Sequence, residues 1–184
     1  MPKATKTKNG RGEPLTVSRP PLLVRGNDEA FRQFVHDTLA FASRIQAIRN
    51  ALGSVIGLSG TQYTILIAIA RENQENNIGI NYIAESLHFS PAFVTIEVNK
   101  LVAAKLVTKK ENPTDRRRVL LSTTPKALEL LRSLTAVQRP VNDMLFESLS
   151  AEDFEWLRHK TPHLVDSADR ALRLFDFMSA NGDG

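Results

Sequence analysis

Residues 90–126 read SPAFVTIEVNKLVAAKLVTKKENPTDRRRVLLSTTPK, and this stretch decides the fold. Ser90-Pro91 predicts a helix start, because a hydroxyl caps free backbone N–H groups and proline is tolerated at the first helical position. We expect this helix to run to about Ala104. Leu106–Glu111 and Arg118–Ser122 then read as two strands joined by a dense turn signal at residues 112–115. The stretch therefore predicts a helix followed by a β-hairpin.

Helical patterns extend from this stretch in both directions. Upstream, residues 28–52 place their apolar side chains mainly on one side of a helical wheel. Ser59 and Gln62 have capping-box spacing before the apolar run 63–70, and a polar loop at 73–79 precedes a short helix at about 81–88. Downstream, Thr124-Pro125 opens a helix to about Leu149 with a kink expected at Pro140, and Ser150 caps a last helix to about residue 179.

A short helix, a turn, a second helix and a two-stranded wing make a winged helix-turn-helix. The fold class is thus predicted as mostly α with a small β-hairpin wing (α+β), with long terminal helices. We expect a basic, disordered or loosely attached tail at 1–27, a DNA-binding region at 58–124, and dimerisation helices at 28–57 and 125–184. A symmetric dimer would cover apolar residues of the last helices: Phe146, Leu149, Trp156, Leu157, Leu164, Leu172, Phe175 and Phe177.

The composition excludes several classes of protein. The 184 residues contain no cysteine, which rules out disulfides, thiolate metal sites and cysteine redox sensing. No stretch approaches the roughly 20 apolar residues of a membrane span, and the amino terminus lacks the apolar segment of a secretory signal. A cytoplasmic protein is the resulting expectation. Nothing resembles a glycine-rich phosphate loop or a catalytic constellation, so neither an enzyme nor a cofactor is predicted.

The positive charge is concentrated in two places. Residues 1–27 carry six basic residues against one acidic residue, whereas the rest of the chain has 18 basic and 19 acidic residues. A solubilising leader is the preferred interpretation of the tail, with an arm touching DNA or a partner as the alternative. Residues 98–126 form the second concentration, with eight basic residues against two acidic ones. Such local charge suits phosphate binding, because neutralised phosphates release their counterions.

From Leu58 to about Leu131 the sequence resembles the MarR family of multiple-antibiotic-resistance-type regulators. The resemblance is carried by residues 58–63 (LSGTQY), 83–87 (IAESL), Val94-Thr95, and above all 112–118 (NPTDRRR) followed by 120–126 (LLSTTPK). It implies a homodimer, a palindromic operator, repression and often a small aromatic effector. Three positions depart from the family pattern: Lys105 and Ala127 stand where glycine is common, and Glu97 stands where an apolar residue is usual.

The helix starting at Pro91 is the predicted recognition helix. On a helical wheel Val94, Val98 and Leu101 point inward, and the opposite side carries the predicted base contacts Ala92, Thr95, Ile96 and Asn99. Asparagine can pair with adenine, and methyl groups can meet the thymine methyl. Lysine at Lys105 would lose the left-handed helix end that glycine favours, while placing a cation at the negative end of the helix. An ordinary surface helix is the alternative.

The wing supplies the remaining predicted DNA contacts. The family's Asp-x-Arg pattern marks Arg117 for minor-groove insertion, with Asp115 holding its guanidinium; simple phosphate contact by residues 116–118 is the alternative. The predicted phosphate contacts are Ser90, Lys100, Lys109, Lys110, Arg116 and Arg118. A non-specific architectural DNA-binding protein is the competing function, although it would favour lysine and arginine over apolar and amide groups on the outer helix face.

An effector site is predicted from Thr38, Arg49 and Tyr63. Arg49 lies near the middle of the apolar face of the first helix, so it must snorkel, pair within the protein or await an anionic ligand. Pairing or snorkelling is favoured over ligand binding. Aromatic carboxylates, their coenzyme A thioesters and no ligand at all stay open, as do repression and activation. His159 and His163 have spacing suited to a shared metal, but a third ligand is not evident and an interface role is preferred.

Overall fold

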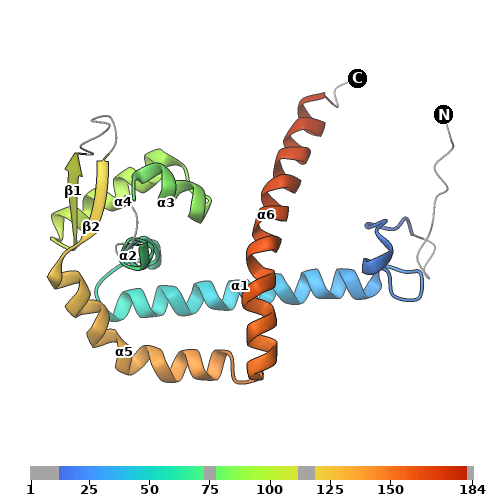
Figure 1. The fold of residues 1–184 in the computed structure, drawn as a ribbon, viewed down its shortest axis with the longest axis horizontal. Helices are drawn as coiled ribbons and strands as arrows, with labels where there is room; N and C mark the ends of the chain where they lie inside the picture. Colours follow the sequence, from blue (N-terminus) through green and yellow to red (C-terminus); the bar gives the residue numbers. More distant parts are fainter. Residues whose placement is uncertain (1–12, 73–77, 112–118, 182–184) are drawn as a thin grey trace. The chain divides into compact units, whose positions relative to one another are not determined.

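The computed structural model describes residues 13–72, 78–111 and 119–181. The chain divides into two compact units, residues 1–135 and 136–184. Figure 1 shows the elements in chain order: η1 (Pro20–Leu22), α1 (Glu29–Val55), α2 (Gly60–Glu72), α3 (Ile80–Leu87), α4 (Pro91–Ala103), β1 (Val107–Glu111), β2 (Val119–Thr123), α5 (Pro125–Leu145) and α6 (Ala151–Asn181). The predicted mostly helical fold with a two-stranded hairpin is confirmed, and most ends lie within three residues of the expected ones.

Side-chain caps explain where the helices begin. At α2, Ser59 N–H donates to Gln62 Oε1 and Gln62 N–H donates to Ser59 Oγ, both at 3.1 Å. Ser150 and Asp153 make the same reciprocal pair at α6, which lowers the pKa of the Asp153 carboxyl. The predicted capping box at Ser59 and the predicted cap at Ser150 are therefore both present.

The β-hairpin is antiparallel, with Val107 opposite Thr123 and Glu111 opposite Val119. Strand β2 also contacts the residues just before α3: Leu121 N–H donates a hydrogen bond to Ile78 O at 2.8 Å. Val107 and Leu121 are buried on the side of the hairpin that faces the core. The hairpin is thus attached to the helical body through one apolar face, as the alternation of strand side chains requires.

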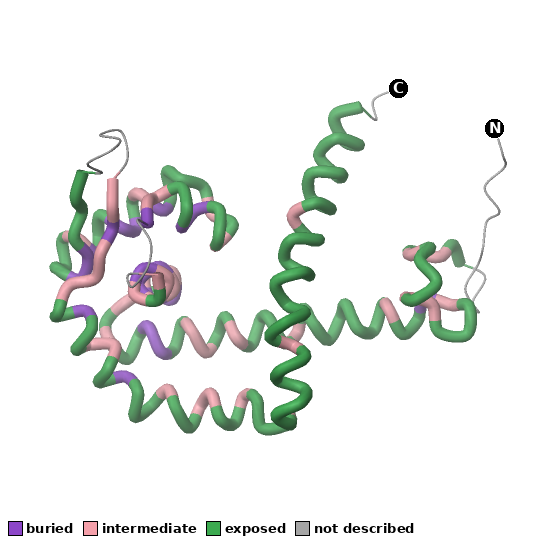
Figure 2. The backbone as a smooth tube through the Cα atoms, in the orientation of Figure 1, coloured by how far each residue is buried: buried purple, intermediate pink, exposed green. Residues whose placement is uncertain are grey.

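Two groups of buried side chains hold the first unit together, and Figure 2 shows them as the purple segments around α2. The larger group joins α2, α3, α4 and the hairpin. The smaller group joins Leu52 of α1, Tyr63 of α2 and Leu134 of α5. Because α1 and the first part of α5 share this second core, the first unit extends to Thr135.

Residues 13–27 differ from the expected disordered tail. Both Thr16 N–H and Thr16 Oγ donate to Asp28 Oδ2, at 2.7 and 2.6 Å, and Arg32 Nε donates to the same oxygen at 3.0 Å. Asp28 is fully buried, and these hydrogen bonds hold its pKa at about 2. The segment is thus fixed to the start of α1 by polar contacts, which its scarcity of large apolar residues did not reveal.

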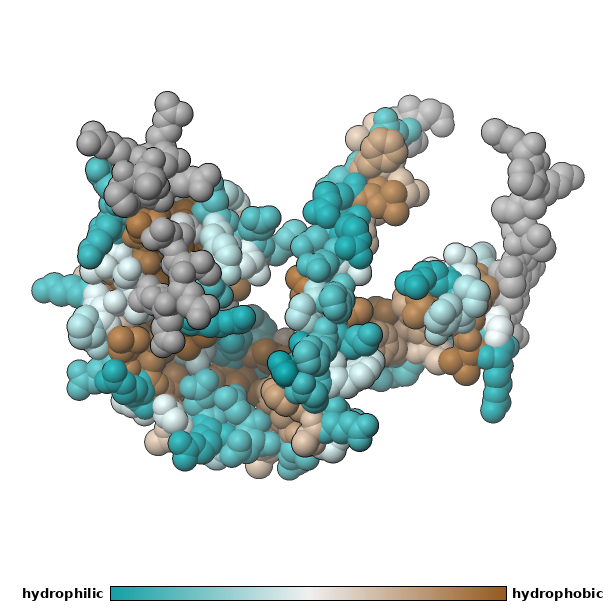
Figure 3. Space-filling view, in the orientation of Figure 1, coloured by the Kyte–Doolittle hydropathy of each residue, from teal (hydrophilic) through white to brown (hydrophobic). Residues whose placement is uncertain are grey.

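The second unit contains the end of α5 and all of α6. Helix α5 continues through Pro140 but ends at Leu145, four residues before the expected end, and Phe146–Leu149 form a turn. No residue of α6 is buried, and its exposed large apolar side chains include Trp156, Leu172 and Phe175. Figure 3 shows apolar surface along α1 and near the carboxyl-terminal end of α6. Both helices therefore present extensive apolar surface.

Among the described residues, no single helix has both the length and the apolar character to cross a membrane. Helices α1 and α2 satisfy that measure only as a pair, bent by 88°.

Candidate nucleic-acid interface

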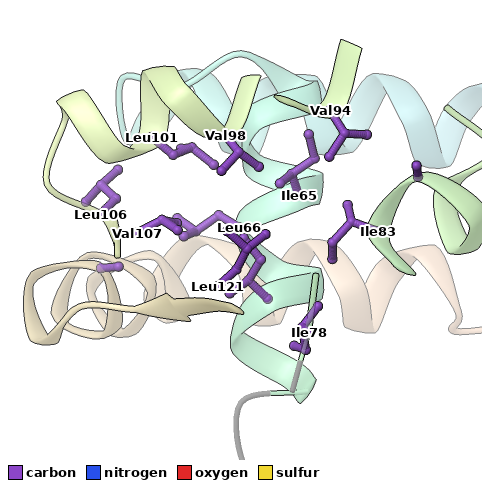
Figure 4. Close-up of a cluster of buried hydrophobic side chains, with 13 residues drawn as sticks. Ile65, Leu66, Ile78, Ile83, Val94, Val98, Leu101, Leu106, Val107 and Leu121 are labelled. Atoms are coloured by element: carbon purple, nitrogen blue, oxygen red, sulfur yellow. The ribbon is translucent and has the colours of Figure 1, made fainter. Parts of the chain in front are cut away.

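Helix α4 is anchored by its inner face. Ser90 Oγ accepts a hydrogen bond from Phe93 N–H at 3.2 Å, which fixes the helix start. Val94, Val98 and Leu101 are at most 1% exposed. Figure 4 shows these three side chains directed toward Ile65 and Leu66 of α2. The predicted inward face is confirmed, so the rotation of the helix about its own axis is fixed.

The opposite face of α4 carries the four predicted base-contact residues. Ala92, Ile96 and Asn99 are exposed, and Thr95 is half-buried with its hydroxyl donating to Pro91 O at 2.8 Å. Ile96 is 55% exposed. The structure therefore places all four on one accessible ridge, and their contact with DNA stays a prediction.

Glu97 lies between the two faces and is only 7% exposed. Its Oε2 accepts from Gln62 Nε2 at 3.1 Å, and its Oε1 accepts from Lys100 Nζ at 2.7 Å. These contacts, with the lysine bond the largest, lower the pKa of the Glu97 carboxyl despite its burial. Glutamate is accommodated where the family usually has an apolar residue, because the capping glutamine of α2 reaches across to α4. The sequence alone did not identify this link.

The carboxyl end of α4 closes in a left-handed conformation at Lys105, whose φ is +59°. Leu106 N–H donates to Leu101 O and Lys105 N–H donates to Val102 O, both at 2.9 Å, which is the Schellman arrangement. Lys126 Nζ adds a hydrogen bond to Ala104 O at 2.9 Å. Lys105 thus adopts the left-handed helix end, although lysine lacks the ease with which glycine takes this conformation.

Three lysines of the predicted phosphate contacts are described, and each is exposed. Lys100 belongs to α4, and Lys109 and Lys110 belong to β1. Lys100 is held by Glu97, and Lys109 Nζ donates to Asn99 Oδ1. Lys110 lies next to Lys109 on the same strand. The structure therefore pairs Lys100 and Lys109 with side chains of α4, and it leaves Lys110 exposed on β1.

The predicted wing contacts Asp115, Arg116, Arg117 and Arg118 lie outside the described residues. Their roles in the minor groove and on phosphates remain predictions. The strands that lead to them are described, and they run from Val107 to Glu111 and from Val119 to Thr123.

The predicted effector residues are brought together only in part. Arg49 Nε donates to Thr64 Oγ1 at 2.9 Å, and its guanidinium carbon lies 5.4 Å from the ring centre of Tyr63. Tyr63 is buried, which raises the pKa of its phenol. Thr38 is exposed, donates to Phe34 O, and lies eleven residues earlier, about 16 Å along the helix. Arg49 thus binds a hydroxyl group and lies over an aromatic ring without pairing with a carboxylate of the described residues, and Thr38 is not beside it.

The histidines of α6 show no metal-binding arrangement in the described part of the chain. His159 Nε2 lies 2.9 Å from Glu155 Oε1, and Glu155 also binds Arg158. No group of three histidine, cysteine, aspartate or glutamate side chains among the described residues could hold a metal ion.

Residues 56–118 match the model of the MarR family. No curated protein is similar enough in sequence to count as a relative. The solved structures similar in fold include three MarR proteins. A MarR protein from Peptoclostridium difficile has a TM-score of 0.62 at 18% identity, covering 84% of this chain and 96% of its own. The regulator MarR from Oenococcus oeni has a TM-score of 0.58 at 19% identity, covering 72% and 98%.

The third is a mutant MarR from E. coli complexed with operator DNA, with a TM-score of 0.58 at 18% identity, covering 74% of this chain and 94% of its own. At these identities the likeness establishes the fold, and the family match covers helices α2, α3 and α4 and the first strand of the hairpin. Residues 56–118 are therefore similar to the MarR family, and the chain has the winged-helix fold of the MarR structures.

Proposed function

We propose that the chain is a sequence-specific repressor that binds a palindromic operator as a homodimer. The observation that carries the proposal is the ridge on α4: its inner face is locked into the core, while Ala92, Ile96 and Asn99 face outward beside basic side chains. Apolar and amide groups in that position suit base edges in the major groove. A structure of E. coli MarR with operator DNA has the same fold, which supports this use of the helix.

The homodimer is supported by α1 and α6. Exposed large apolar side chains lie on α1, among them Phe34 and Leu39, and on α6, among them Trp156, Leu172 and Phe175. Isolated soluble chains seldom expose contiguous apolar surface on this scale. A second copy would cover the same surface on both partners, and it would place two recognition helices for two half-sites.

The competing function is architectural, sequence-independent DNA binding, and one experiment separates the two. The chain is bound to a pool of duplex DNA with a randomised centre, and the bound fraction is sequenced. We expect enrichment of a two-fold symmetric pattern. Asn99→Ala should cost about 1–3 kcal/mol and relax the preference at one position in each half-site. Lys110→Ala should weaken all sequences alike and reduce the salt slope by about one.

An unselective wild-type chain would support the architectural alternative. An unchanged profile for Asn99→Ala would contradict the proposed orientation of the recognition helix.

Release by a small aromatic acid or its coenzyme A thioester is the regulatory part of the proposal. Arg49 is half-buried, and no carboxylate of the described residues lies within ion-pair distance of it. Its Nε is bound to Thr64, so its remaining N–H groups are the donors for an anion, with Tyr63 supplying an aromatic neighbour.

We expect Arg49→Ala to bind DNA normally and to lose the response to such an acid. For a tenfold loss of operator affinity, about 1.4 kcal/mol of differential binding between two states suffices. The measurement is DNA affinity in a concentration series of salicylate and of benzoyl-coenzyme A. An unchanged response in the Arg49→Ala chain would assign Arg49 a purely structural role.

A further inference from the structure

Strand β1 contacts the outward face of α4, which carries Thr95, Ile96 and Asn99, through the side chain of Lys109. Lys109 follows Val107 by two residues, so both side chains lie on the same face of β1. Val107 and the cross-strand partner of Lys109, Leu121, are both buried there. Lys109 therefore extends from the face of the hairpin that packs on the helical body, and its ammonium donates to Asn99 Oδ1. Lys110 belongs to the opposite face, opposite Leu120.

This contact changes the hydrogen bonds that Asn99 can offer. A side-chain amide has one oxygen that accepts and one NH₂ group that donates twice. When the ammonium of Lys109 binds the oxygen, the amide is oriented with its donors away from the lysine. An ammonium has donors only. Asn99 and Lys109 together therefore present N–H donors and a positive charge beside Ile96 and Thr95.

The edges of the two purines respond to this difference in opposite ways. Adenine offers an acceptor at N7 and a donor at its N6 amino group, so it needs both the oxygen and the NH₂ of asparagine. Guanine offers two acceptors, N7 and O6, and no donor on that edge. An ammonium beside the N6 amino group of adenine would set donor against donor, whereas beside guanine O6 it would make a charge-assisted hydrogen bond.

We propose that Lys109 is a positioning residue that sets base specificity: by holding Asn99 Oδ1 it makes the Asn99–Lys109 pair select guanine, where Asn99 alone would select adenine. The inference rests on the proposed sequence-specific function. It assigns Lys109 a task different from that of Lys110, although the two lysines are adjacent, alike in charge and both exposed.

The test compares five full-length chains on a pool of duplex DNA with a randomised centre: wild type, Lys109→Met, Lys110→Met, Asn99→Ala and the double variant Lys109→Met/Asn99→Ala. Methionine keeps an unbranched apolar stem and removes the ammonium. We expect the wild type to enrich guanine at one position in each half-site. Lys109→Met should change the guanine-to-adenine ratio there by about tenfold in favour of adenine, which corresponds to one bidentate contact.

Two comparisons isolate the mechanism. In the Asn99→Ala background, Lys109→Met should move the preference at that position by well under tenfold, because the amide that it orients is gone and only the direct contact of the ammonium is lost. Lys110→Met should lower the affinity for every sequence and leave the base profile as in the wild type. A merely structural or phosphate-binding role for Lys109 would reproduce the Lys110→Met result.

The failures are distinguishable. Adenine at this position in the wild type, or a Lys109→Met profile that keeps guanine, overturns the inference and leaves sequence-specific binding intact. A wild-type chain with no base preference anywhere overturns both proposals.

Discussion

Two residues, one in the middle of α4 and one just after its end, differ from the family pattern, and local contacts compensate for each difference. Lys105 occupies a left-handed conformation that costs a side-chain-bearing residue about 1–2 kcal/mol relative to the helical region. The Schellman hydrogen bonds and the contact of Leu101 with Leu106 in the core keep it there. Glu97 is likewise retained by Gln62 and Lys100.

Lys105 gives a prediction at this scale. Lys105→Gly should be more stable than Lys105→Ala by about 1 kcal/mol, because both variants lose the charge and only glycine adopts the left-handed region freely. The measurement is urea unfolding of both variants at one protein concentration. Ala103→Gly, two residues earlier in helical conformation, is the matched control and should lower stability by roughly 0.5–1 kcal/mol. Equal stability of the two Lys105 variants would contradict the strain assigned to this position.

At the residue scale, the sequence predicted which side chains of α4 point into the core. It did not predict which polar side chains bind one another. The inward side of α4 followed from the spacing of Val94, Val98 and Leu101, because a helix has a fixed period. The pairing of Lys109 with Asn99 did not follow, since it depends on how the hairpin folds back over the helix. A lysine two residues after a buried strand valine was the available signal for it.

At the scale of elements, the start of a helix was predictable wherever a side chain caps a backbone N–H group in the first turn. Ser59 with Gln62, Ser90 with Phe93, and Ser150 with Asp153 are all contacts within four residues. The attachment of residues 13–27 was not predictable, because its anchor joins Thr16 to Asp28 across twelve positions and uses polar groups. The early end of α5 was also missed, since the apolar pattern continues beyond Leu145 into the turn.

The hydrogen bonds between Thr16 and Asp28, which hold residues 13–27 against the start of α1, should weaken as the pH falls. Hydrogen bonds from Thr16 are the largest cause of the lowered pKa of Asp28, about 2 against an ordinary 3.8. Because the folded-state pKa is depressed, the stabilisation is complete above pH 3.8 and is lost as the pH falls toward 2. We expect the amide resonance of Thr16 to titrate with a midpoint near pH 2 in NMR spectra. In Asp28→Asn that titration should be absent, and a wild-type midpoint near 3.8 would contradict the attachment.

At the scale of the whole molecule, the apolar surface of α6 gives a prediction of assembly. Light scattering should report twice the 20.5 kDa of one chain. Leu172→Asp combined with Phe175→Asp should shift the protein toward the monomer, because both side chains are exposed, apolar and one turn apart. Arg170→Asp, on the other side of the same helix, is the control and should leave the dimer intact. A stable monomeric wild-type chain would contradict the homodimer.

Helix α6 leaves all 31 of its residues unburied within one chain, and this has a consequence for the dose response of the proposed repressor. If two chains must meet before an operator with two half-sites is filled, then in the dilute range the dimer concentration rises with the square of the chain concentration. Halving the supply of protein would then reduce operator occupancy about fourfold. The exposed apolar helix would thus convert a gradual change in protein level into a steep change in transcription.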